Sequence, residues 1–408
     1  MGSLRRFRIG RRAILLSGAG LLSFYGLSAH SQVTSSEISS RNLAQDACPS
    51  VDPAYIQTAN ETGGIPMFLQ RSEVAKAFHL VRESTRSNVA TVLRANGVFD
   101  GTAQTFNIPV DSETKRITFA FSVDTKGGRV TLTQPSGGSI VPGTANTEIT
   151  ELHCGRVVTV APPESGIWHA EIAGSGRFWI EAQAQSDIHF ISAEFVKLGG
   201  RPGHEGLFRI TGQPLAGTSA TLQVSLSAKD TDSTEFRLVT ERGDTIQQLQ
   251  MDVTRSDPQF LEFVGSFECP RHPFRVAVTG RDPKGQTYQR FFSTLFHAET
   301  VEVLPGNELD GLLAGHAQQI SFAVRNAGAS AKFKVTVTDA KHFVSQIVPS
   351  ELTLGAGESG TIRVDLTVPA GTAPGIGDDI IVVVSSITGP ASSNSSVMHV
   401  SVSSPSSH

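Results

Sequence analysis

The sequence lacks clustered basic residues, and after its N-terminal stretch it lacks any long apolar run. Lys and Arg total 34 against 38 Asp and Glu, which gives a formal net charge of -4 over 408 residues. Nucleic acids and anionic membranes are bound through clustered Lys and Arg, and here these residues are scattered after the first twelve. We therefore expect no nucleic-acid partner and no membrane span in the mature chain.

Signatures of catalysis are also absent. The sequence has no Gly-x-Ser-x-Gly elbow, no His-Glu-x-x-His motif, no phosphate-cradling glycine loop and no paired-cysteine zinc spacing. Nothing therefore indicates a nucleophile, a resident metal or a cofactor. The sequence predicts a protein that is not an enzyme, with no catalytic, cofactor-binding or metal-binding residues to assign.

Cysteine is scarce, and its count is odd. The three residues are Cys48, Cys154 and Cys269. In an oxidising compartment one pair can close and leave one thiol over, but spacing does not choose among the three pairings. Three unpaired thiols in or near packed cores are an equally good interpretation.

The N-terminus carries the features of an export signal. Five arginines between Arg5 and Arg12 precede an apolar run from Ala13 to Leu27, and Ala29-His30-Ser31 offers small residues for cleavage. We expect a signal peptide over 1–31, by the general route or, from Gly10-Arg11-Arg12, the twin-arginine route. The mature chain is then secreted, periplasmic or displayed at the cell surface, and the Ser-rich residues 32–46 form a flexible leader.

Residues 47–88 predict a short helical segment. Asp52 before Pro53, with Gly63-Gly64 after Thr62, supplies an N-cap, a first-turn proline and a terminating glycine. A brief strand over 65–69 and a second helix capped by Ser72 follow, with a predicted apolar stripe of Val74, Ala77, Phe78 and Val81. Such a segment cannot enclose a core alone, so it must pack on something else.

The rest of the chain is rich in glycine (39) and proline (20) and alternates short strands with turns. Between Pro162 and Phe195, apolar residues recur every second position on either side of Gly174-Ser175-Gly176, which predicts a β-hairpin. We expect a mainly β protein of tandem β-sandwich domains, immunoglobulin-like or galactose-binding-like, after a short α/β remnant. The expected boundaries are 89–198, 199–297 and 298–403, with a disordered tail over 404–408.

Several stretches resemble a known family. Asp52 to Leu69 is similar to the last helix and strand of a von Willebrand factor A domain. Gly166 to Pro202 and Pro273 to Arg290 resemble hemicentin-like proteins and von Willebrand factor A domain-containing protein seven, and Leu352 to Thr372 resembles immunoglobulin-like modules of exported bacterial proteins. The chain departs from the family because it lacks the Asp-x-Ser-x-Ser metal loop and most of the von Willebrand A domain. The resemblance implies an extracellular, non-catalytic adhesion or matrix role.

Few residues are candidates for a site. Trp168 and Trp179 can each stack on a sugar if exposed, and strand alternation places Trp179 opposite Phe178 and Ile180, so Trp179 is the candidate ligand platform. Large aromatic residues in sandwiches usually belong to the core, which is the competing interpretation.

Polar residues offer weaker candidates. If two strands were neighbours, four residues could converge on a transition metal: His169, Glu171, Asp187 and His189. A solvated strand face explains them as well. The oxygen-rich run 230–234 could hold calcium but lacks the glycine and distal glutamate of a dedicated loop, and His204-Glu205 is explained by a solvated turn.

The leading hypothesis is therefore an exported, non-enzymatic adhesion, surface or matrix-type protein whose β-sandwich surfaces bind an extracellular or cell-envelope protein. The alternative is a glycan-binding module or an accessory protein of an extracellular enzyme.

Overall fold

The computed structural model of the chain describes residues 47–199, 203, 205–227, 234–257, 259–306, 309 and 311–403. The predicted signal peptide, leader and C-terminal tail lie outside these residues. The chain divides into two compact units. Among the described residues, the first takes in 47–192, 225–262 and 274–295, and the second takes in 193–224, 263–273 and 296–403.

The helix predicted after Asp52 is present as α2 (Pro53–Thr62). The Asp52 carboxylate accepts a hydrogen bond from the Ala54 backbone N–H at 3.0 Å, which satisfies a donor that the first turn leaves free. Gly63 ends the helix with φ +83°, a left-handed conformation that glycine adopts at little cost. The sequence signals for this helix are confirmed.

The rest of this segment corrects two expectations. Residues 65–69 are buried but form no strand. The second helix is preceded by a 3-10 turn, η1 (Arg71–Glu73), and α3 spans Val74–Ser84. Its buried face is not the predicted stripe, because Phe78 is 60% exposed and the buried residues are Ala77, His79, Leu80, Glu83 and Ser84. Three of the inward positions are occupied by polar residues that form hydrogen bonds, namely His79, Glu83 and Ser84.

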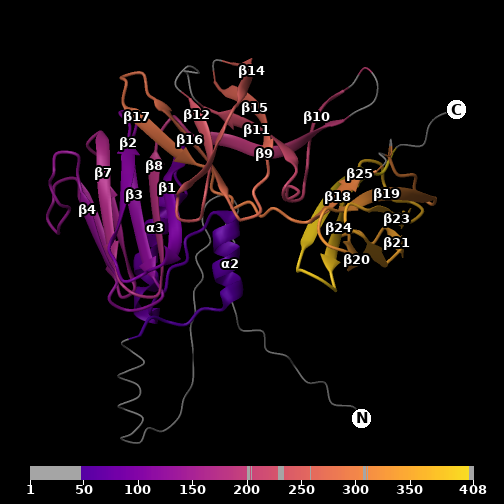
Figure 1. The fold of residues 1–408 in the computed structure, drawn as a ribbon, viewed down its shortest axis with the longest axis horizontal. Coiled ribbons are helices and arrows are strands. Elements are labelled where there is room, and N and C mark those ends of the chain that lie inside the picture. The colour runs from indigo at the N-terminus through magenta and orange to yellow at the C-terminus, as the bar shows by residue number, and fades with distance from the viewer. Residues whose placement is uncertain are drawn as a thin grey trace, which may run out of the picture. The chain divides into compact units, whose positions relative to one another are not determined.

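The first unit is built on a nine-stranded antiparallel sheet (Figure 1). Across the sheet its strands are β13 (Thr245–Leu249), β12 (Glu235–Val239), β16 (Arg275–Arg281), β17 (Thr287–Phe291), β1 (Val89–Val98), β8 (Arg177–Gln185), β3 (Arg116–Val123), β6 (Gly155–Val160) and β5 (Thr147–Leu152). Its central strands are buried on both faces; β3 buries every residue from Ile117 to Val123. Such a strand must be covered on both sides.

A three-stranded sheet covers one face. It consists of β2 (Gln104–Val110), β7 (Gly166–Ala173) and β4 (Arg129–Thr133), with β7 in the middle. Aromatic rings join the two layers: Phe119 of β3 lies 5.4 Å from Trp168 of β7, and Phe178 of β8 lies 6.2 Å from Phe106 of β2. Residues 47–88, which we call the helical block, cover the opposite face.

The predicted hairpin over Pro162 to Phe195 is wrong. β7 and β8 are consecutive in sequence but do not pair, since β7 belongs to the small sheet and β8 to the large one. Gly176, at φ +74°, turns the chain from one layer to the other. Alternation shows only that each strand buries a face, and it is the same for a hairpin and for a crossing between sheets.

Strands expected in a second sandwich extend the first sheet. β17 pairs with β1 at Thr91 and Phe291, and the turn between β12 and β13 reaches the end of β1, where the Asn96 N–H donates to the Glu241 carbonyl at 2.9 Å. β12, β13, β16 and β17 thus continue the sheet of residues 89–185. That residues 89–198 and 199–297 fold as independent domains stays a prediction.

A five-stranded sheet runs in the order β10 (Gly206–Arg209), β9 (Phe190–Gly199), β11 (Ser219–Leu226), β15 (Leu261–Glu268) and β14 (Asp252–Ser256). The chain passes from one unit to the other within β9, β11 and β15. In the second unit, Phe195 packs edge-on against Phe296, with ring centroids 5.0 Å apart.

Residues 301–402 form a β-sandwich with a core of their own. One sheet is β18 (Val301–Pro305), β19 (Ala317–Asn326), β23 (Ser359–Thr367) and β21 (Val344–Val348). The other is β22 (Glu351–Leu354), β20 (Ala331–Thr338), β24 (Gly377–Ser386) and β25 (Ser393–Ser401). Strict alternation, as in β23 and β24, places Ile362, Val364, Ile380 and Val382 inside at 0% exposure.

The mainly β, tandem-sandwich fold with an N-terminal helical remnant is therefore confirmed. Within the described residues, no helix is both long enough and apolar enough to cross a membrane.

Candidate functional site

Trp179 does not form a surface platform. Its side chain is 4% exposed, its ring packs 5.4 Å from that of Phe68, and its Nε1 donates to Asn60 Oδ1 at 3.1 Å. The expectation fails because β8 is a central strand with both faces covered, so the side opposite Phe178 is also buried. Trp168 is fully buried and donates to the Glu164 carbonyl.

The four polar candidates for a metal do not converge. His169 and Glu171 are exposed on β7, whose neighbours are β2 and β4, and His169 Nδ1 bonds Asn107 Oδ1 at 2.8 Å. Asp187 instead pairs with Lys115 at 3.1 Å, and His189 bonds Ser227 Oγ at 2.9 Å. The part of the chain that the structure describes holds no group of three or more metal-ligating side chains. Residues 230–233 and His204 lie outside it.

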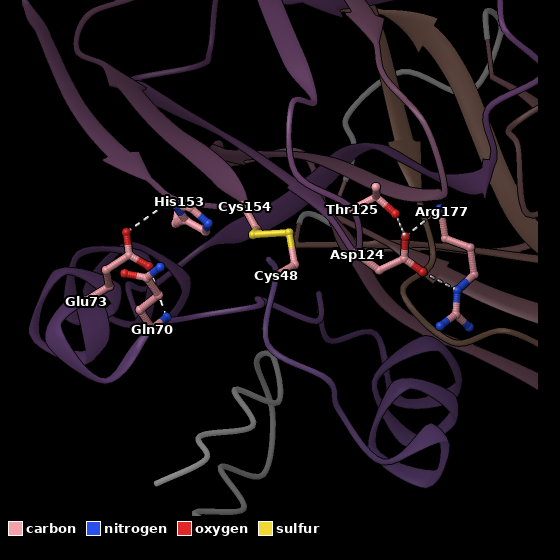
Figure 2. The surroundings of a disulfide bond; sticks show 8 residues. All are labelled: Cys48, Gln70, Glu73, Asp124, Thr125, His153, Cys154 and Arg177. Atoms are coloured by element: carbon pink, nitrogen blue, oxygen red, sulfur yellow. Dashed lines mark hydrogen bonds and ion pairs between the residues drawn. A yellow bond between two sulfur atoms is a disulfide. The ribbon is translucent and has the colours of Figure 1, made fainter. Parts of the chain in front are cut away.

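The structure instead brings together residues that fasten the helical block to the sheet. Cys48 and Cys154 form a disulfide that joins the start of the block to the turn between β5 and β6 (Figure 2). Cys269 is left as a buried free thiol, and burial raises its pKa to about 12. A thiol this reluctant to ionise is a poor nucleophile.

A buried carboxylate holds the same turn beside the disulfide. Glu73 is 7% exposed; it accepts hydrogen bonds from the backbone N–H of His153 at 2.7 Å and from that of Gln70 at 3.0 Å (Figure 2). One side chain thus ties η1 to the β5–β6 turn and satisfies two backbone donors. Removing it would leave both donors without this acceptor.

Arg94 of β1 holds the carboxyl end of α2. Its guanidinium donates to the carbonyls of Gly63 and Gly64 and pairs with Glu181 of β8 at 3.2 Å. Carbonyls at a helix end lack intrahelical partners, and a cation there is favoured by the helix dipole. Desolvation lowers the pKa of Arg94, and Glu181 opposes that effect.

Arg275 lies at the same place with fewer partners. It is 0% exposed, and Nη2 donates weakly to the Asn60 carbonyl at 3.4 Å. Its Nε and Nη1 find no acceptor among the described residues. Desolvation, with the charge of Arg94, lowers its pKa to about 9.

α3 is attached through a denser polar network. His79 bonds Thr150 Oγ1 at 2.9 Å and Thr159 Oγ1 at 3.1 Å, and Ser84 Oγ donates to Gln183 at 2.8 Å. Burial lowers the pKa of His79, so its neutral form is held, although Glu148 opposes the shift. Burial alone would raise the pKa of Glu83, but hydrogen bonds from Arg86 and Arg82 lower it.

Sequence reasoning did not identify this fastening. Arg94 lies within β1, Glu181 within β8 and Arg275 at the start of β16, and a charged residue in a buried strand signals a buried partner. The residues predicted as sites were instead on exposed faces or in the core. Chemically the arrangement is a docking contact, made of ion pairs, caps and a disulfide.

Two family models match the chain. The hemicentin galactose-binding domain-like family matches residues 91–187, and the VWA7 Ig-like domain family matches residues 303–404. Hemicentin-1 of Mus musculus is 23% identical over 251 residues, and hemicentin-1 of Homo sapiens is 24% identical over 251. Each alignment covers 59% of this chain but only 4% of the relative.

Among solved structures, the ICAM-5 D1–D4 ectodomain fragment aligns with 76% of this chain and 77% of its own at 10% identity, with a TM-score of 0.19. The two family matches fall on separate sandwiches of the structure. Residues 91–187 therefore resemble the hemicentin galactose-binding domain-like family and residues 303–404 the VWA7 Ig-like domain family, and the chain is similar to hemicentin-like proteins over these regions.

Proposed function

We propose that this chain is an exported, non-enzymatic adhesion, surface or matrix-type protein whose β-sandwich surfaces bind an extracellular or cell-envelope protein. The observation that carries the proposal is the presence of two hemicentin- and VWA7-type regions in one chain. The disulfide between Cys48 and Cys154 supports it, because such bonds persist in oxidising compartments outside the cytosol.

The arrangement of polar residues also supports a binding role. His169 and Glu171 are exposed on β7, where His169 bonds Asn107, whereas Asp187 pairs with Lys115 and His189 bonds Ser227, so the four side chains do not surround one point. The free thiol is buried, with its pKa raised to about 12. The site that the described residues do build fastens two parts of the fold, which suits a protein that keeps its surfaces in a fixed arrangement.

A pull-down tests the proposal. The purified mature chain, from residue 32 onward, is used as bait against the native extracellular fraction, and retained proteins are identified by mass spectrometry. We expect an extracellular or envelope protein to be enriched saturably and to be displaced by unlabelled mature chain. Folded bait that enriches nothing, or that chemically turns over material in that fraction, would contradict it.

Glycan recognition is a second candidate, favoured by one exposed polar surface. The outer face of the small sheet presents Asn107, Thr131, His169 and Glu171 side by side across β2, β7 and β4. Planar amide, imidazole and carboxylate groups are the kind that bind sugar hydroxyls. A glycan array with the mature chain, repeated with His169→Ala, tests this. Binding lost in the variant supports it, and an array without binding removes it.

A further inference from the structure

The helical block is attached to the sheet unevenly along its length. α3 buries five of its eleven residues and carries the network of His79, Glu83 and Ser84. α2 buries only Ile56 and Ala59 of its ten. We call residues 48–64 the N-terminal arm. The Cys48–Cys154 disulfide links the start of the arm to the β5–β6 turn. Arg94 binds the far end of the arm, where the backbone continues into residue 65.

The N-terminal arm lies over groups that are rarely buried without full pairing. Beneath it are the Trp179 ring and three charged side chains, Arg94, Glu181 and Arg275. Arg94, Glu181 and Arg275 are 4%, 2% and 0% exposed, and Glu181 forms an ion pair with Arg94 but with no nitrogen of Arg275 among the described contacts. With the arm in this position, Nε and Nη1 of Arg275 have no acceptor among the residues that the structure describes. Closure therefore costs free energy that opening would return, because the donors would then reach water.

We propose that the N-terminal arm is a redox-fastened strap: the Cys48–Cys154 disulfide holds it closed over Trp179 and Arg275, and reduction of that bond lets it lift while α3 stays docked. The reductant is a dithiol. One of its thiolates displaces a sulfur of the disulfide, its second thiol then closes on the first, and Cys48 and Cys154 are released as thiols. Two electrons and two protons pass from the dithiol, which leaves as a disulfide.

The two ends of the helical block therefore respond differently to reduction. The arm loses its covalent tie, and its buried surface is small. Near α3, Glu73 still binds the His153 N–H, and His79 still bonds Thr150 and Thr159. Opening is therefore local, and it exposes an indole and a guanidinium that the closed arm conceals.

Hydrogen exchange of the full mature chain, followed by mass spectrometry, tests the strap. Peptides from α2 and α3 are compared before and after reduction with dithiothreitol. We expect the exchange of α2 to rise about tenfold or more beyond any rise in the exchange of α3. Iodide quenching of tryptophan should rise in parallel. Unchanged α2 exchange, or equal loosening of α2 and α3, would overturn the proposal.

Variants extend the test without reductant. Cys48→Ser with Cys154→Ser should reproduce the open arm while Cys269 is untouched.

In reduced protein, Arg275→Met should return α2 exchange to within about threefold of the oxidised value, because no orphaned donor is left under the arm. Arg281→Met, an exposed residue on the same strand, is the matched control and should leave opening unchanged. An arm that opens equally with Arg275→Met would refute the role of the buried guanidinium. If the cysteine double variant does not fold by circular dichroism, the comparison of oxidised with reduced protein decides the outcome.

Discussion

Glu73 is the residue whose removal should show most directly how the helical block is fastened. Its two oxygens accept the N–H groups of Gln70 and His153, and the side chain is buried. Glu73→Ala should lower the free energy of unfolding by about 1–3 kcal/mol, because those donors lose their acceptor. Urea denaturation measures it. Glu171→Ala, at an exposed position of β7, is the control and should stay within about 0.5 kcal/mol of the parent; a similar loss in both variants would contradict the assignment.

His79 should make the fold sensitive to mild acid. Its folded-state pKa is lowered from 6.5, chiefly by desolvation, with Glu148 and Glu83 opposing and Arg82 and Arg116 adding to the shift. The unfolded chain then binds the proton more readily than the folded chain does. The contribution of His79 to the free energy of unfolding is therefore complete above pH 6.5 and is lost as the pH falls below that value. His189 has a shift of the same sign.

The prediction is checked by denaturation between pH 5 and pH 7.5. Glu83 keeps its contribution in this window, because its pKa is lowered from 4.5. His79→Gln should reduce the dependence on pH, whereas His169→Gln, on the exposed face of β7, should leave it intact. A parent protein equally stable across the window would show that the buried imidazole is not held neutral.

At the residue scale, the sequence indicates types of environment better than it indicates partners. Trp179 was correctly placed opposite Phe178 and Ile180, yet alternation does not show that both faces of β8 are covered. Helical spacing likewise predicts that Phe78 lies on the inner face of α3. In the structure Phe78 is exposed, and Glu83 is among the buried residues. Glu83 is buried with Arg82 and Arg86, its neighbours in sequence, and with Arg116 of β3, and only this last partner is distant in sequence.

At the scale of elements, the disulfide should contribute substantially to stability. It joins residues 106 apart in sequence, and closing a long loop restricts the unfolded chain. We expect reduction, or Cys154→Ser, to lower the free energy of unfolding by about 2–4 kcal/mol. Guanidinium denaturation with and without reductant measures this. A Cys269→Ser variant should respond to reductant as the parent does, and an insensitive parent would mean that the bond is not formed in solution.

The contact between β1 and α2 should be equally sensitive. Arg94→Met leaves Glu181 buried without its cation and removes the cap from α2, which should cost about 3–5 kcal/mol. Thermal or urea denaturation provides the measurement. Arg94→Met with Glu181→Met should regain part of the loss, because no charge is then stranded. A double variant that loses as much as the two single variants together would show that the pair is not coupled.

Element types follow from local signals, while sheet partners do not. Asp52, Pro53 and Gly63 define α2 because capping is a local property, and the strands of the third sandwich follow from alternation that survives in the fold. The hairpin over Pro162 to Phe195 fails because pairing is decided by layers that assemble from distant strands. β17 meets β1 across almost two hundred residues, and no local pattern encodes that contact.

At the scale of the whole molecule, the C-terminal sandwich of residues 301–402 should fold by itself. Its hydrophobic cluster draws only on residues between Val301 and Val402. A fragment of residues 298–403 should therefore unfold cooperatively and give dispersed amide resonances. The matched control is the same fragment with Phe322→Ala, a fully buried position, which should lose about 3–5 kcal/mol. A fragment without a cooperative transition would contradict the predicted boundary at 298.

We propose that this chain acts outside the cell by binding through its sandwich surfaces. The most direct measurement is retention of labelled, oxidised mature chain on native extracellular matrix or cell envelope, titrated to saturation and competed with unlabelled chain. The account predicts saturable retention that unlabelled chain displaces and that leaves the bound material chemically unchanged. Folded protein that shows no saturable retention, or that converts the material it meets, would contradict it.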